Sequence, residues 1–193
     1  ASGRIQNGKE AVRLLVERDY TTAIEMAGKI NLYNEARKGI DKQMTEQAED
    51  LVRHLPDLEQ RRAIVVYNKE CHKGVIGIVA SRLTEQYYRP AVVLTESEGV
   101  ATGSARSVSG FDVYKAVADC SDLLENFRGH TYAAGLSLKV ENVEAFTERF
   151  EAYVEKHILD EQTQASLDID AVLDFKDITF GFYKQLRRLP PFG

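Results

Sequence analysis

The chain has 193 residues, 44% of them hydrophobic and 28% charged, and its formal net charge is −5. This apolar content excludes a disordered chain, and 13 glycines and 4 prolines are too few for a collagen-like or low-complexity one. The longest apolar runs, 63–67 and 75–80, fall far short of the roughly 20 residues that span a bilayer. The composition indicates a soluble α/β protein with no membrane segment.

The charge is unevenly distributed. Residues 141–174 hold ten acidic and two basic side chains, a balance of −8, which leaves 20 acidic and 23 basic side chains, or +3, for the rest. A nucleic-acid partner that meets a local basic face is therefore compatible with the acidic total. Cys71 and Cys120 form no CxxC pair, which favours reduced thiols and a cytoplasmic location. The missing initiator Met and the turn-like end, Leu189–Gly193, lead us to expect a piece of a longer protein.

The first part of the chain predicts helices. Residues 8–18 carry apolar side chains at helical spacing, and a second short helix is expected after Tyr20. From Asn31 to Leu55 the pattern is long, polar and only thinly apolar, which is typical of a helix that bridges two domains. Pro56 ends it, so we expect a connector helix over 31–55.

Strand and helix patterns alternate from residue 56 onward. Strands are expected at 63–67, 91–95, 99–106 and 133–140, and an alternation of apolar and acidic residues predicts another at 167–175. Helices are expected at 74–87, 111–120, 143–159, with Asn142 as N-cap, and 177–188. This order predicts a mixed β-sheet flanked by helices.

One segment of unusual content, Cys71–Gly77, joins a predicted strand to a predicted helix. Its glycines, Gly74 and Gly77, would let an anion approach backbone N–H groups that lack partners at a helix N-terminus, with His72 beside them. Equally, the two glycines could serve only to pack the helix closely against the sheet. The spacing alone leaves both interpretations open.

Two further segments carry candidate ligands for an anion. Ser104 and Arg106 are two residues apart on a predicted strand and so share one face, where both could hold one phosphate. Alternatively, Arg106 is an exposed strand residue and Ser104 a turn former. Gly129-His130, followed by Ala-Ala-Gly, leaves an imidazole with little side chain around it, which suits a hydrogen bond to a phosphate or a base. A purely structural histidine is the alternative.

The chain carries no recognisable hydrolytic motif. No two of its four histidines are spaced as in HxxxH, and GxSxG and Walker motifs are absent. We therefore expect no metal or other cofactor to be bound by these 193 residues themselves.

Taken together, these segments resemble the DHHA1 domain of the DHH phosphoesterase superfamily, and within it the RecJ family of single-stranded-DNA-specific exonucleases. His72–Leu83 resembles the family pattern after its first DHHA1 strand, Gly103–Ser107 its Gly-Ser-x-Arg-Ser segment, and Gly129–Leu136 its Gly-Gly-His-x-x-Ala-Ala-Gly signature. Two positions depart from the family: Arg128 stands where Gly is usual, and Cys71 where Trp is common.

The resemblance implies a domain organisation. Residues 1–30 would be the end of the catalytic DHH domain, 31–55 the connector helix, 56–160 the DHHA1 substrate-binding domain, and 161–193 the truncated start of an OB-type nucleic-acid-binding region. Implied too is a metal-dependent 5′-to-3′ exodeoxyribonuclease, a hydrolase of DNA repair and recombination. Its Mn²⁺ or Mg²⁺ ions would be held by the DHH domain, so the 193 residues alone are expected to be inactive.

Site residues follow from the same resemblance. Ser104 and Arg106 would bind the terminal 5′-phosphate, and Gly129 and His130 a neighbouring phosphate or the scissile group. Arg4 would reach this cleft from the catalytic side, and the other groove-lining residues would be His72 and Gly74.

The resemblance also implies partners and leaves other functions open. Single-stranded DNA would be the substrate, and a single-strand-binding protein or a RecQ-type helicase would be further candidate partners. One alternative is a related DHH–DHHA1 oligoribonuclease or nucleotide phosphodiesterase, although residues 166–193 extend beyond the usual end of such enzymes. Another is a non-catalytic DHHA1 module that binds RNA.

Overall fold

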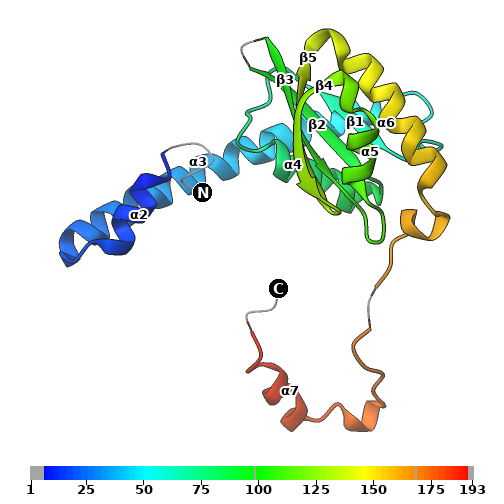
Figure 1. Ribbon diagram of the computed structural model, residues 1–193. Helices are drawn as coiled ribbons and strands as arrows, with labels where there is room; N and C mark the ends of the chain where they lie inside the picture. Colours follow the sequence, from blue (N-terminus) through cyan, green and yellow to red (C-terminus); the bar gives the residue numbers. More distant parts are fainter. Residues whose placement is uncertain (1–6, 98, 168, 191–193) are drawn as a thin grey trace.

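The structure is a computed structural model that describes residues 7–97, 99–167 and 169–190. Its centre is a five-stranded sheet in the order β1-β2-β3-β5-β4 (Figure 1). β1 (Ile64–Tyr67) runs parallel to β2 (Ala91–Ser97), and all other neighbours are antiparallel: β3 (Val100–Arg106), β5 (Ala133–Lys139) and β4 (Leu124–His130). The predicted mixed α/β sheet flanked by helices is confirmed.

Helices cover the two faces of the sheet unequally. On one face α5 (Val113–Asp119) and α6 (Val143–His157) enclose a core that reaches from β1 to β5 and includes the fully buried Phe146 and Phe150. On the other face α4 (Ile76–Tyr87) packs on β2 and β3, and its apolar side chains share a second core with Ile64 and Val66 of β1. Because α4 reaches no further than β3, the same face of β5 and β4 is left to polar residues.

The N-terminal helices form a long extension. α2 (Lys9–Val16) folds back on α3 (Tyr20–Arg53), and the C-terminal part of α3 packs on α4 (Figure 1). The predicted break near residue 30 is wrong, because α3 runs unbroken for 34 residues. Neither Pro nor a capping sequence interrupts it, and Asp19 caps its start by accepting a hydrogen bond from the Thr22 N–H at 2.8 Å. One helix, Tyr20–Arg53, therefore takes the place of the predicted short helix and the predicted helix over 31–55.

Two strand predictions need correction. Residues 167–175 form no strand in the part that the structure describes; their apolar side chains are exposed because no described edge of the sheet pairs with them. The fifth strand is instead β4, whose sequence LENFRGH lacks the period-two apolar pattern because this edge strand is largely exposed. Asn142 does occupy the N-cap position of α6, as predicted, but its side chain makes no capping hydrogen bond and instead donates to the Leu123 carbonyl.

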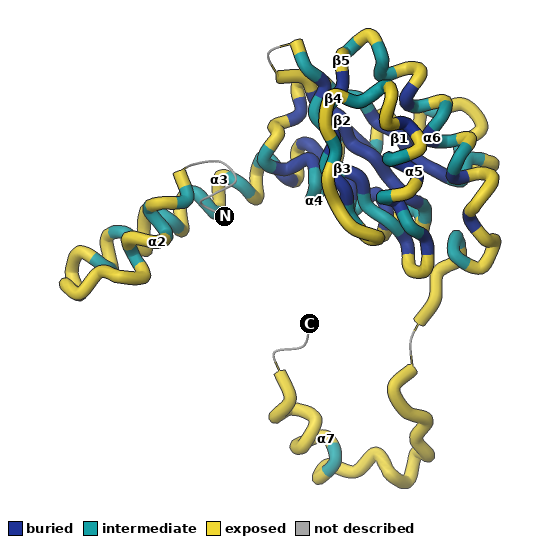
Figure 2. The backbone as a smooth tube through the Cα atoms, in the orientation of Figure 1, coloured by how far each residue is buried: buried dark blue, intermediate teal, exposed yellow. Residues whose placement is uncertain are grey.

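The C-terminal segment leaves the sheet as an exposed arm (Figure 2). It contains the short 3₁₀ helices η3 (Asp160–Thr163) and η4 (Phe175–Asp177), and α7 (Phe180–Leu186), a shorter helix than the predicted 177–188. Among the helices that the structure describes, none is both long and apolar enough to cross a membrane.

An ion pair fixes α3 against α4. The Asp41 carboxylate, 4% exposed, accepts a hydrogen bond from Arg82 Nη2 at 2.8 Å, and Arg37 Nη1 lies 4.0 Å away. Arg82 Nη1 also donates to Thr45 Oγ1 at 3.2 Å. The second Asp41 oxygen has no hydrogen-bond partner among the described residues, so Arg82 is the principal group that compensates this buried charge.

Replacing Arg82 should therefore cost more than replacing an exposed arginine of α3. We expect Arg82→Ala to lower the free energy of unfolding by about 1–3 kcal/mol, because it leaves a buried acceptor unsatisfied. Arg53→Ala, which removes an exposed pair with Glu49, should cost about 0.2–1 kcal/mol. Urea denaturation of both variants checks this, and equal losses would contradict it.

Both cysteines should be chemically inert in the folded chain. Burial raises the pKa of the Cys71 thiol to about 11 and that of the Cys120 thiol to about 12. Since the thiolate is the reactive form, fewer than about one Cys71 in 10³ is reactive at neutral pH. A disulfide reagent such as DTNB should release no colour from the native chain and titrate two thiols after denaturation. Rapid reaction of the native chain would contradict the burial of these side chains.

Candidate functional site

The uncovered part of the sheet is a polar surface built by strand register. Antiparallel pairing puts Arg106, Ala133 and His130 in one row across β3, β5 and β4, and Ser104, Gly135 and Arg128 in the next. Paired residues point to the same face, and so do residues two apart along a strand. We call this surface the open face and define it by the polar residues and glycine that lie on it: Thr102, Ser104, Arg106, Asn126, Arg128, His130, Gly135 and Ser137.

Ser104 and Arg106 occupy the part of the open face nearest to α4. The prediction that they share one face is confirmed, because Arg106 Nη1 donates to Ser104 Oγ at 2.8 Å. The same Nη1 donates to the Ala105 carbonyl, also at 2.8 Å. These bonds fix the guanidinium beside the Ser104 hydroxyl, so that both polar groups present themselves to one ligand.

Gly77 allows the first turn of α4 to approach this pair closely. A Cβ atom at position 77 would lie 2.8 Å from Arg106 Nη2 and 3.2 Å from Ser104 Oγ. No side chain caps α4, whose N-cap residue is Val75. A cavity of about 270 Å³ is lined here by Gly74, Gly77, Ile78, Ser81 and Arg106. The close-packing interpretation of Gly77 is therefore correct, and its packing partner is a cation beside the start of a helix.

The loop before α4 adds two further basic side chains. His72 is exposed, and its Nδ1 accepts a hydrogen bond from the Gly74 N–H at 3.0 Å. Because Nδ1 is the acceptor, the neutral ring carries its proton on Nε2, which is left as a donor. Lys73 lines a second cavity of about 260 Å³ over the open face, shared with Thr102, Asn126 and Arg128 among others.

Gly129 and His130 end β4, a strand that the sequence did not predict. His130 Nδ1 accepts from the Tyr132 N–H at 3.3 Å, so its Nε2 is also a donor, and the imidazole lies two strands, about 10 Å, from Arg106. Gly129 points to the opposite face of the strand, and a Cβ there would lie 2.3 Å from the Ala133 carbonyl oxygen. Tight pairing with β5 therefore explains this glycine.

Several residues of this surface were missed by sequence reasoning. Ser81 lines the Arg106 cavity, and its position four residues after Gly77 in a predicted helix was a usable signal. Asn126 could not be placed, because β4 itself was not predicted. Arg4, the remaining candidate, lies outside the described residues.

The open face and the first turn of α4 together offer several hydrogen-bond donors that suit a negatively charged ligand. They include a guanidinium, a hydroxyl, two imidazole N–H groups and the backbone N–H groups of an uncapped helix start. Such donors suit phosphate oxygens, for which arginine forks and helix N-termini are common ligands.

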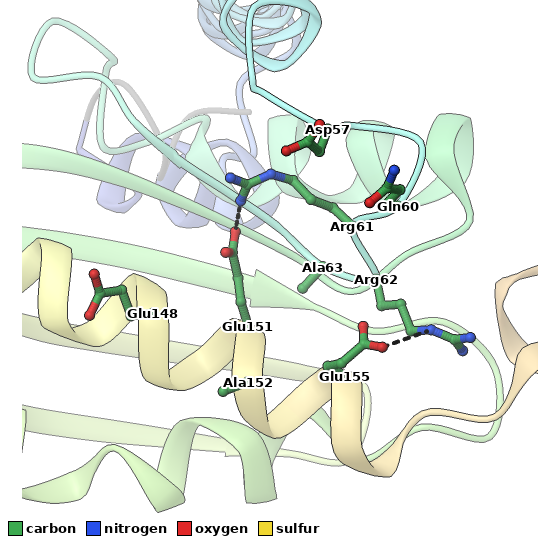
Figure 3. A pocket seen from close by; sticks show the side chains of 9 residues that line it. All are labelled: Asp57, Gln60, Arg61, Arg62, Ala63, Glu148, Glu151, Ala152 and Glu155. Atoms are coloured by element: carbon green, nitrogen blue, oxygen red, sulfur yellow. Dashed lines mark hydrogen bonds and ion pairs between the residues drawn. The ribbon is translucent and has the colours of Figure 1, made fainter.

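A separate cavity of about 440 Å³ lies between the segment before β1 and α6 (Figure 3). Arg61 points to Glu151 and Arg62 to Glu155, and Arg62 also pairs with Asp160 at 2.5 Å. Burial raises the pKa of the Glu151 carboxyl, while the charge of Arg61 acts in the opposite direction. Both arginines of the cavity are thus paired with carboxylates, and these ion pairs join α6 to the segment before β1.

The described residues do not fit a metal centre. They contain no group of three or more His, Cys, Asp or Glu side chains placed to hold an ion. Chemistry that depends on a divalent metal therefore cannot be assigned to the side chains in this part of the chain.

Comparison with known proteins identifies the relatives of this chain. Residues 60–156 match the model of the DHHA1 domain. The chain is 37% identical, over its whole length, to the single-stranded-DNA-specific exonuclease RecJ of Bacillus subtilis (strain 168), and 30% identical to that of Haemophilus influenzae. It spans 25% and 35% of the length of these two curated relatives.

Solved structures agree with the sequence comparison. The crystal structure of RecJ from Thermus thermophilus in complex with Mg²⁺ superposes with a TM-score of 0.84 at 26% identity, over 100% of this chain and 29% of that one. The Mn²⁺ complex from the same organism gives 0.84 at 27% identity, over 100% and 28%. With more than half of its residues in the matched domain, the chain belongs to the DHHA1 family and is similar over its whole length to RecJ exonucleases.

Proposed function

We propose that this chain is the strand-holding part of a RecJ-like 5′-to-3′ exonuclease specific for single-stranded DNA. In this proposal residues 56–160 hold the substrate, 31–55 belong to the connector, 1–30 are the end of a DHH catalytic domain, and 161–193 begin an OB-type region. The B. subtilis and H. influenzae relatives carry the name single-stranded-DNA-specific exonuclease, and the chain aligns with them from end to end.

The observation that carries the proposal is the contact between Arg106, Ser104 and Gly77. A terminal 5′-phosphate, with its extra negative charge, would take a forked pair of hydrogen bonds from Arg106 and further ones from Ser104 Oγ and the first N–H groups of α4. His130 Nε2 would donate to a neighbouring phosphate about 10 Å away, with Gly129 shaping the hairpin that carries it. His72 and Gly74 would line the groove.

Cleavage itself is proposed to take place outside this chain. The T. thermophilus relatives were solved with Mg²⁺ and with Mn²⁺, and such ions activate water for phosphodiester hydrolysis. The described residues of this chain do not fit an ion, so their role is to bind and orient the strand. We accordingly expect no nuclease activity from the 193 residues alone.

Removing the Arg106 side chain should weaken recognition of the strand end. We expect Arg106→Ala to lower affinity for a 5′-phosphorylated 12-mer by about 10- to 150-fold, the effect of losing a charge-assisted hydrogen bond of about 1.5–3 kcal/mol. The loss for the 5′-hydroxyl strand should be smaller. Fluorescence anisotropy at two salt concentrations measures both, since phosphate contacts also set the salt dependence.

Arg149→Ala is the matched control, because Arg149 lies on α6, on the covered side of the sheet, and pairs with Asp122. It removes the same charge and should leave both affinities unchanged. Equal losses for the two strands in Arg106→Ala would exclude recognition of the phosphorylated end. Competition by dinucleotides as strong as by the 12-mer would favour an oligoribonuclease or phosphodiesterase, and a preference for tRNA would favour an RNA-binding module.

Gly77 gives a second test, in which binding is expected to weaken while stability changes little. Gly77→Ala should displace the Arg106 guanidinium and weaken binding of the 5′-phosphorylated strand, while alanine gains about 0.5–1 kcal/mol of helix stability that offsets the crowding. Gly39→Ala, in an open position of α3 with no atom within 4 Å, should stabilise the chain and leave binding unchanged. Urea denaturation and anisotropy on both variants check this; unchanged binding in Gly77→Ala would refute the role of the contact.

A further inference from the structure

A fourth cavity lies further along α4 from the Arg106 cavity. Its volume is about 520 Å³, and it is enclosed by the C-terminal turn of α4, the loop after β3 and the segment that contains η3. The side chains that line it include Thr84, Glu85, Tyr88, Ser109, Glu161 and Gln162. Neither the substrate-holding contacts of the open face nor the ion pairs near β1 involve any of them.

The wall of this cavity contains an unsatisfied hydroxyl. Thr84 is 8% exposed, and its Oγ1 has no hydrogen-bond partner among the described residues. Threonine in a helix commonly donates to the carbonyl four residues earlier, as Thr147 does to Val143 at 2.8 Å. A buried polar group without a partner is costly, so an orphan at a cavity wall points to a ligand that supplies the missing bond.

The rim of the cavity holds an aromatic ring in an unusual backbone conformation. Tyr88 ends α4 with φ 51° and ψ 43°, the left-handed region that a bulky residue rarely adopts, and its side chain is 43% exposed. Glycine or asparagine would meet this geometry at lower cost. Tyr88 nevertheless supplies a flat apolar surface at the mouth of the cavity.

The polar groups of the cavity select against phosphate. Its lining residues include two carboxylates, Glu85 and Glu161, together with amide and hydroxyl groups, and none of those that the structure describes is Lys or Arg. Such a lining repels anions and instead pairs with N–H donors and neutral acceptors. A flat neutral group that offers both, as a nucleobase does on its Watson–Crick edge, matches these acceptors, the Thr84 hydroxyl and the Tyr88 ring.

This cavity and the Arg106 cavity are lined by side chains from the same face of α4. Gly77, Ser81 and Glu85 are four residues apart and Tyr88 follows three later, so their side chains project from one face of the helix. With a rise of 1.5 Å per residue, Gly77 and Thr84 are separated by about 10 Å along the axis. That distance spans at most about three nucleotides, because even stacked nucleotides are 3.4 Å apart.

We infer that this cavity binds one base of the single strand, within three nucleotides of the 5′ end, between the Tyr88 ring and the Thr84 hydroxyl. The inference rests on the proposed function and adds a second recognition element to it. The phosphates of the DNA strand lie at Arg106 and the open face, whereas one of its bases lies beside the C-terminal turn of α4, in a pocket without Lys or Arg among its described residues. The Glu85 and Glu161 carboxylates keep phosphate out of that pocket.

The test combines modified strands with two variants. The strands are 5′-phosphorylated 12-mers, each with one abasic residue at nucleotide 1, 2, 3 or 4. The wild-type chain should lose about 5- to 150-fold in affinity at one of these positions, the effect of losing one stacked base. Thr84→Val and Tyr88→Asn should bind the intact strand more weakly and show no further loss at that position, as a double-mutant cycle requires. Asparagine tolerates the left-handed conformation at position 88.

Stability separates a binding role from a structural one. Thr84→Val removes an unpartnered hydroxyl from a buried site, so its unfolding midpoint in urea should be unchanged or higher while binding weakens. Thr147→Val, the helical threonine of α6 with a satisfied hydroxyl, is the control and should leave binding unchanged. Equal abasic losses in wild type and variants, with a retained preference for the 5′-phosphate, would overturn the base pocket and leave the proposed function standing. No binding of any strand by the wild type would overturn both.

Discussion

The unequal covering of the two sheet faces is the constraint from which the functional surface follows. α5 and α6 bury one face across the sheet, whereas α4 reaches only as far as β3 on the other. Because side chains alternate, a strand such as β3 must place Ala101, Gly103 and Ala105 in the core and Ser104 and Arg106 outside it. The edge of α4 therefore decides which polar residues meet solvent and which meet a helix N-terminus.

Much of the fold could be predicted because, in most of its helices and strands, apolar residues recur at the spacing typical of that element. The buried strands and the amphipathic α4 and α6 show this, and their predicted bounds agree with the structure to within a few residues. β4 could not be found, since an exposed edge strand has no apolar alternation. Residues 167–175 have that alternation without a partner strand, and pairing, which is not local, decides whether a strand forms.

The candidate site was predictable only in part, for a similar reason. The pairing of Ser104 with Arg106 depends on spacing along one strand, which the sequence displays. The approach of Gly77 to Arg106 depends on how closely a helix packs on that strand, and no pattern in either segment encodes this distance. The orphan hydroxyl of Thr84 is still less visible, because an unmade hydrogen bond is defined by everything that surrounds it.

The length of α3 has a mechanical consequence. No described residue of this helix before Asp41 is buried, so about 30 Å of helix projects beyond the point where it packs on α4. The Asp41–Arg82 ion pair lies at the point where the projecting part begins. A rotation of α3 by about 10° about this point would move its N-terminal end by about 5 Å, a displacement larger than a hydrogen bond is long. The orientation of the projecting part relative to the open face thus depends on how the rest of α3 packs on α4, which involves the Asp41–Arg82 ion pair and the buried Met44, Ala48 and Val52.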